Sequence, residues 1–201
     1  MKDALRTAMV PSVAFLVGGV PFSNMVAEIT ADTDLRDVET GTVSGTALYR
    51  VAGLGPLIVA VICDIGKGAV GPFLARDRHT LAAVSVGFAV AGHNWSPFLR
   101  GAGGRGISPA VGGLSLVAWP GSLVLLAGLA VGRLAGQTGL GAFFSHAALV
   151  PVLRATHGRV GTIAGAVTVA ALWGKRLAGN RPPRNQAIHV YLSRLLFDSD
   201  V

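Results

Sequence analysis

Charged residues are scarce in this 201-residue sequence, and cysteine occurs only once. Lys, Arg, Asp and Glu make up 13% of the chain, whereas soluble domains usually carry about 25%. The mean hydropathy is +0.58, and apolar runs recur along the whole length. This composition is not that of a soluble domain, and it predicts an integral membrane protein.

The single cysteine, Cys63, lies inside an apolar run, so it offers neither a disulfide within the chain nor a thiolate cluster for a metal. No group of Cys and His residues has zinc-site spacing. We therefore expect no metal and no cofactor.

Basic residues outnumber acidic ones by seven, and they gather at the ends of the apolar runs. In that position they are expected to face lipid headgroups or an anionic substrate. Aromatic residues are few, at 6%, and none alternate with basic residues on one face. Hence the expected partner is the lipid bilayer and not a nucleic acid.

The apolar runs predict an all-α integral membrane protein with about seven transmembrane helices, some of them short or broken. The first run follows Lys2 and Arg6 without a clear cleavage site, so it is expected to remain as a helix. Residues 1–179 form the predicted polytopic membrane domain. Residues 180–201 are predicted to be a Pro/Arg linker followed by a short amphipathic tail. The runs span residues 9–26, 54–75, 81–91, 107–132 (broken at Trp119-Pro120-Gly121), 142–153 and 161–173.

A glycine loop, residues 92–109, interrupts this apolar pattern. Gly101, Gly103, Gly104 and Gly106 surround Arg105, and Ser108-Pro109 predicts a helix N-cap and first turn. Backbone N–H groups in such a loop can cradle a phosphate. The alternative is a flexible turn between helices with an interfacial arginine, and the local sequence alone favours that alternative.

Two further stretches place charge near apolar helices. Residues 28–46 hold half of the acids and lead directly to Arg50 at the start of the next apolar run. That run contains Asp64 and Lys67, which share a helix face and can pair. Charges at such depth are candidates for function, although a buried ion pair that only fixes helix packing is an equal alternative.

Three stretches, in this order, resemble the bacterial acyl-phosphate:glycerol-3-phosphate acyltransferases of the PlsY family. The family's first motif, Asp-Ile-Arg-x-x-Gly-Ser-Gly-Asn-x-Gly-Ala-Thr-Asn-x-x-Arg, is matched in part. The second piece is Asp-x-x-Lys-Gly, and the third stretch is Gly-His-x-Phe-Pro-x-Phe-Leu-x-Phe-Lys-Gly-Gly-Lys-Gly. The matching residues are Asp34, Arg36, Gly41, Thr46 and Arg50, then Asp64, Lys67 and Gly68, then Gly92, His93, Phe98, Leu99, Gly103, Gly104 and Gly106.

The sequence also departs from the family pattern. Thr40 replaces the serine of the first motif, Thr42 and Ala47 replace its asparagines, and Arg105 replaces a lysine. Threonine keeps a hydroxyl, and arginine keeps the charge with a different donor geometry. A His-Arg-x-Asn-Ile-like motif, which the family carries near the C-terminus, is not found here.

The resemblance implies a seven-helix enzyme that transfers a fatty acyl group from acyl phosphate to the 1-hydroxyl of glycerol 3-phosphate. Its product would be lysophosphatidate, the start of phospholipid synthesis. No His-x-x-x-x-Asp motif supplies a protein base, so positioning and charge stabilisation would carry the rate. A substrate phosphate would itself accept the hydroxyl proton.

On this reading Arg50 and Arg105 grip phosphate, and Thr40 donates a hydrogen bond to it. The loop glycines supply backbone N–H groups behind the phosphate. Arg36, Lys67 and His93 are weaker candidates for contact with substrate. Two alternatives stay open: a non-catalytic membrane protein of the same fold, and a small transporter. We expect the glycine loop to face the cytoplasm; oligomeric state is undetermined. The residues expected to contact substrate in addition to Thr40, Arg50 and Arg105 are Gly103, Gly104, Gly106, Arg36, Lys67 and His93.

Overall fold

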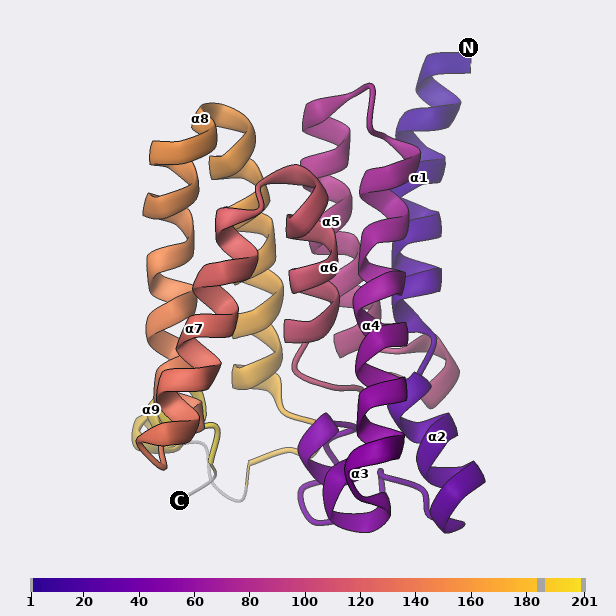
Figure 1. Ribbon diagram of the computed structural model, residues 1–201, viewed down its shortest axis with the longest axis vertical. Helices are drawn as coiled ribbons and strands as arrows, with labels where there is room; N and C mark the ends of the chain where they lie inside the picture. The colour runs from indigo at the N-terminus through magenta and orange to yellow at the C-terminus, as the bar shows by residue number, and fades with distance from the viewer. Residues whose placement is uncertain (1, 184–186, 200–201) are drawn as a thin grey trace.

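The computed structural model describes residues 2–183 and 187–199, which form a bundle of helices without a strand (Figure 1). The predicted linker and tail therefore lie in part outside the described residues. The elements are α1 (Lys2–Gly19), α2 (Phe22–Ala31), α3 (Gly45–Ala52), α4 (Leu54–Leu74), α5 (His79–Asn94), the 3-10 turn η1 (Pro97–Leu99), α6 (Ile107–Val117), α7 (Pro120–Leu134), α8 (Thr138–Ala178) and α9 (Ile188–Phe197).

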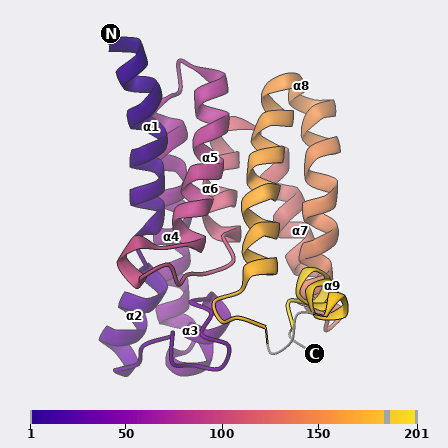
Figure 2. The same cartoon turned by 180° about the vertical axis from the view of Figure 1, so that it is seen from behind.

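Prolines and one glycine divide the long apolar runs where the backbone cannot continue as helix. α7 starts at Pro120, so the break predicted at Trp119-Pro120-Gly121 is confirmed. The run 9–26, predicted as one segment, is instead divided between α1 and α2 at Val20-Pro21. Gly158 has φ +56° and ψ −134° inside α8, and the chain turns back there into a second arm (Figures 1 and 2). The predicted segments 142–153 and 161–173 are these two arms.

The start of α6 differs from the prediction by two residues. Ser108 is not the N-cap: α6 begins at Ile107, and Gly106 occupies the N-cap position with φ +76°. The reason is that glycine adopts this left-handed conformation at little cost, which ends the loop earlier than a serine cap would.

Within the described part of the chain, two segments are long and apolar enough to cross a membrane: residues 3–31, through α1 and α2, and α4. α6, α7 and α9 are shorter apolar helices. Large apolar side chains on the outside of the bundle, among them Ile58, Ile62 and Leu126, are about half exposed or more. Such an apolar exterior is suited to contact with lipid tails.

Glycines let α4 and α6 approach until backbone meets backbone. A Cβ at Gly68 would lie 2.0 Å from the carbonyl oxygen of Pro109, and one at Gly112 would lie 1.8 Å from that of Ile65. Small residues allow this close packing between membrane helices. Because α6 begins at the end of the glycine loop, the contact also sets the position of that loop relative to α4.

We expect Gly68→Ala to lower the free energy of unfolding by about 1–3 kcal/mol, because the new methyl group forces α4 away from α6. Gly66→Ala is the matched control on the same helix, since a Cβ there meets nothing within 4 Å. Thermal unfolding in detergent, followed by tryptophan fluorescence, measures both variants. Equal stability of the two would contradict the close contact.

The short helices and the polar loops lie at the end of the bundle opposite the N-terminus. α2, α3 and α9 lie at this end in both views, together with residues 32–44 and the glycine loop (Figures 1 and 2). The backbone N–H of Val43 donates to the carbonyl oxygen of Gly103 at 3.2 Å, which joins the two loops directly. Stretches that are 60 residues apart in sequence therefore form one surface.

Candidate active site

A cavity of about 860 Å³ opens at the loop end of the bundle. One wall comes from residues 38–50 and α4, the other from α7, α8 and the residue after α9, and Arg105–Ser108 lies between them. This volume suits a small ligand. The charged side chains that line it are Glu39, Arg50, Asp64, Arg105, Arg133, Arg176 and Asp198.

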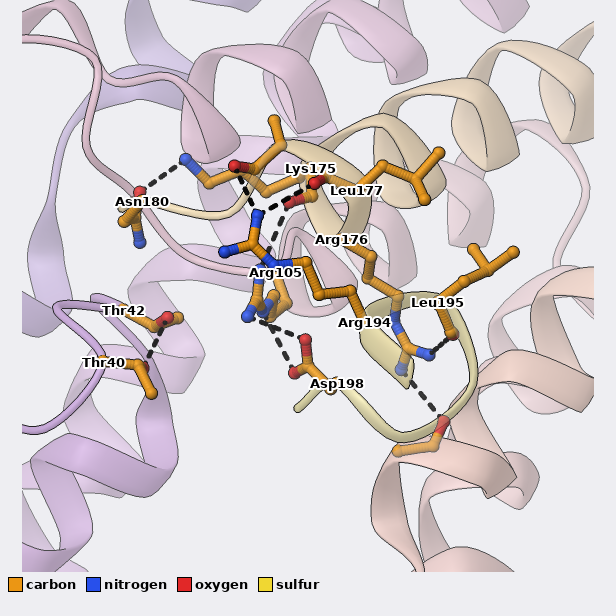
Figure 3. A network of polar contacts seen from close by, with 12 residues as sticks. Thr40, Thr42, Arg105, Lys175, Arg176, Leu177, Asn180, Arg194, Leu195 and Asp198 are labelled. Carbon is orange, nitrogen blue, oxygen red and sulfur yellow. Dashed lines mark hydrogen bonds and ion pairs between the residues drawn. The ribbon is translucent and has the colours of Figure 1, made fainter. Parts of the chain in front are cut away.

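Local hydrogen bonds shape the first wall. Ser44 caps α3, with its hydroxyl oxygen accepting from the N–H of Ala47 at 3.2 Å. Thr40 lines the cavity, and its hydroxyl lies 3.0 Å from that of Thr42 (Figure 3). Arg50 also lines the cavity and forms an ion pair with Glu39 in which both side chains are about half exposed. Thr40 and Arg50 thus share one wall of the cavity.

Asn180 holds the glycine loop in place from the end of α8. Its side-chain oxygen accepts from the N–H of Gly103 at 3.1 Å, and its side-chain N–H donates to the carbonyl of the same residue at 2.8 Å. The N–H of Gly104 donates to the carbonyl oxygen of His93 at 3.2 Å. In this conformation the N–H groups of Gly103 and Gly104 are therefore not available to a phosphate, contrary to the cradle predicted from the sequence. Gly106, by contrast, lines the cavity.

Arg105 projects from the glycine loop toward the residue that follows α9. Its guanidinium contacts both carboxylate oxygens of Asp198, at 2.7 and 3.0 Å, and donates to the carbonyl oxygen of Lys175 at 3.3 Å (Figure 3). About one fifth of the Arg105 side chain is exposed. The arginine thus borders the cavity while its charge is neutralised from within the protein.

Asp64 and Lys67 form the ion pair that their spacing predicts. The ammonium nitrogen lies 2.7 Å from an Asp64 oxygen and donates to the carbonyl oxygen of Val20 at 2.6 Å, at the break between α1 and α2. Both side chains are almost fully buried. Asp64 lines the large cavity, whereas Lys67 faces a separate cavity of about 10 Å³. Lys67 is therefore occupied by packing partners rather than directed at a ligand.

His93 and Arg36 are the other two predicted substrate contacts, and only His93 lines the cavity. His93 lines the large cavity, with its Nδ1 3.8 Å from Asp64, which is beyond hydrogen-bond distance. Arg36 does not line that cavity. Its guanidinium instead forks onto Asp34 at 2.5 and 3.0 Å, and these hydrogen bonds hold the pKa of the Asp34 carboxyl below its usual value.

The sequence analysis did not select four charged residues that line the cavity: Glu39, Arg133, Arg176 and Asp198. The two arginines stand at the ends of apolar runs, a signal shared with cations that only face lipid headgroups. Arg176 donates to the carbonyl oxygens of Leu195 and Gly139, which fastens α9 and the start of α8 to the second arm. Among the described residues, no three His, Cys, Asp or Glu side chains are grouped to hold a metal ion.

The helical bundle has the fold of a known class of integral membrane protein. The fold matches PlsY (YgiH), an integral membrane glycerol 3-phosphate acyltransferase solved in its glycerol 3-phosphate form, with a TM-score of 0.72 over 85% of this chain and 88% of that one. The sequences are 21% identical. The structure of the lysophosphatidic acid form matches with a TM-score of 0.71.

Sequence comparison identifies the family. The model of the glycerol-3-phosphate acyltransferase family matches residues 8–180. The glycerol-3-phosphate acyltransferase of Jannaschia sp. is 32% identical over 89% of both chains, and one from Thermus thermophilus is 38% identical over about half of each. This chain belongs to the glycerol-3-phosphate acyltransferase family, and it is an integral membrane protein.

Proposed function

We propose that the protein transfers a fatty acyl group from acyl phosphate to the 1-hydroxyl of glycerol 3-phosphate, giving lysophosphatidate and inorganic phosphate. The observation that carries the proposal is that Thr40, Arg50 and Arg105, separated in the sequence, line one cavity. The names of the relatives and the two ligand forms of PlsY support the same acceptor and product.

In the proposed reaction, the hydroxyl oxygen attacks the acyl carbon, and the bond from that carbon to the phosphate oxygen breaks. The phosphate leaves with the electron pair and takes the hydroxyl proton. Arg50 and Arg105 hold the phosphates and offset negative charge that develops in the transition state. Thr40 donates a hydrogen bond to a phosphate oxygen. Binding would exchange the present carboxylate partners of the arginines, Glu39 and Asp198, for phosphate.

The decisive experiment supplies purified protein in detergent with palmitoyl phosphate and labelled glycerol 3-phosphate. We expect labelled lysophosphatidate, and we expect palmitoyl-CoA to give none. Arg50→Ala should reduce product formation at least about tenfold, because it removes a charged contact to phosphate. Arg78→Ala, which removes an arginine that pairs with Asp3 in the first turn of α1 and does not line the cavity, is the control.

The opposite results have clear meanings. No product from folded protein, beside an active relative assayed in parallel, would contradict the enzymatic function and favour a non-catalytic membrane protein of this fold. Flux of glycerol 3-phosphate into proteoliposomes without product would favour a transporter. Product from palmitoyl-CoA would support an acyltransferase activity with acyl-CoA, and not acyl phosphate, as the acyl donor.

A further inference from the structure

The contact between Arg105 and Asp198 uses the part of the arginine that best binds an anion. Nε donates a hydrogen bond to one carboxylate oxygen at 3.0 Å, and one terminal nitrogen forms an ion pair with the other oxygen at 2.7 Å (Figure 3). The other terminal nitrogen donates to the carbonyl oxygen of Lys175. The same edge of the guanidinium is one through which arginine binds phosphate. A phosphate could not take the same edge of Arg105 while Asp198 remains there.

Asp198 is placed by the chain that follows the family-matched region, which ends at residue 180. Its carboxylate lines the same cavity as Arg50 and Thr40, and about a quarter of its side chain is exposed. It therefore brings a negative charge into the space that the proposed substrates, both phosphates, would enter. A carboxylate beside an incoming phosphate disfavours binding through like-charge repulsion.

Helix α9 is fastened to α8 independently of Asp198. Arg194 is buried and donates to the carbonyl oxygens of Leu177 and Ala178 at 3.1 Å, and Arg176 donates to that of Leu195 at 2.6 Å. Asp198 follows these anchors as the C-cap of α9, in the left-handed conformation. Rotation of its side chain alone would release Arg105 and leave α9 in place.

We propose that Asp198 is an internal competitor for the phosphate group of the substrate. The Asp198 carboxylate occupies the anion-binding edge of Arg105 until a phosphate displaces it. Asp198 therefore raises the substrate concentration needed to half-saturate the site. The inference rests on the proposed function only in its choice of ligand; competition between Asp198 and phosphate is a property of binding. The apparent affinity of such a site is lowered by the fraction of protein in which the edge is free.

Isothermal titration of inorganic phosphate and of glycerol 3-phosphate into the full chain in detergent tests the proposal. Asp198→Asn removes the charge and keeps a residue that tolerates the left-handed conformation. We expect its dissociation constants for both ligands to be about three- to tenfold lower than those of the unmodified protein, which corresponds to an edge that is free about 10–30% of the time. In the acyl-transfer assay, the KM for glycerol 3-phosphate should fall in the same proportion.

Two further variants separate competition from a structural effect. Asp77→Asn removes a carboxylate that contacts Arg6 in the same two-point way, at 2.7 and 2.5 Å, but outside the cavity, so phosphate affinity should not change. In an Arg105→Ala background, Asp198→Asn should no longer strengthen phosphate binding. Asp198→Ala serves the same comparison if the asparagine variant does not fold.

Each result decides one of the two claims. Tighter phosphate binding by Asp198→Asn without any acyl transfer would support competition and remove the proposed function. Acyl transfer with a dissociation constant unchanged or raised in Asp198→Asn would keep the function and overturn competition, since a positioning role for Asp198 predicts weaker binding. Phosphate binding by neither protein would overturn the competition proposal.

Discussion

Arg105→Ala is expected to lower kcat/KM for glycerol 3-phosphate by about 10²-fold or more, because in the proposed reaction it removes a charged two-point donor to phosphate. Arg105 borders the cavity as the first residue of the stretch Arg105–Ser108, at the end of the glycine loop. The kinetics of acyl transfer from palmitoyl phosphate, measured over a range of glycerol 3-phosphate concentrations, give the value. Arg105→Lys should retain part of the activity, since it keeps the charge and loses the fork.

Arg100→Ala is the matched control for this variant. Arg100 belongs to the same loop region, is exposed, and does not line the cavity. Its replacement should leave kcat/KM nearly unchanged. An equal loss in Arg100→Ala would attribute the effect to loop conformation instead of phosphate binding, and full activity of Arg105→Ala would remove Arg105 from the site.

Lys67→Met is expected to lower the free energy of unfolding by about 3–5 kcal/mol, the usual cost of breaking a buried ion pair by removing one partner. The Asp64 carboxylate would then stay buried with the Ser23 hydroxyl, which lies 3.3 Å away. The carbonyl oxygen of Val20 would lose its ammonium donor at the break between α1 and α2. Thermal unfolding in detergent, with tryptophan fluorescence as the signal, measures the loss.

The double variant Asp64→Asn, Lys67→Met should recover much of that stability, because it leaves no unpaired charge in the bundle. Arg6→Met is the control: it breaks the exposed ion pair with Asp77. It should change the midpoint of thermal unfolding little, since exposed ion pairs are screened by water. A double variant as unstable as Lys67→Met would show that the lysine matters through packing and not through its charge.

Much of the fold could be predicted because the signals are local. Low charge and repeated apolar runs indicate a membrane protein, and Pro120 marks a helix break because proline lacks the N–H that a continuing helix needs. The spacing of Asp64 and Lys67 predicts their contact because residues three apart share a helix face. The first residue of α6 was misplaced because Ser108 resembles a cap, whereas Gly106 provides the conformation that the turn requires.

The site was predictable only where one segment supplies its chemistry. Arg50 and Arg105 could be selected because each stands beside a polar or glycine-rich stretch in an apolar chain. The use of the Gly103 and Gly104 N–H groups could not be foreseen, because their acceptors belong to Asn180 and His93. Nor could Asp198 be connected with Arg105, since the two residues are 93 positions apart and α9 brings them together.

The sequence by itself determined the membrane class, most of the helical segments and the family resemblance, since each depends on residue type and short-range spacing. The tertiary structure alone decided which charges are available to a ligand. Lys67 is directed into packing, while Arg50 and Arg105 remain at the cavity beside carboxylates. The physical reason is that the ion-pair partner of a charged side chain depends on how helices distant in sequence pack together. A local sequence pattern does not contain that information.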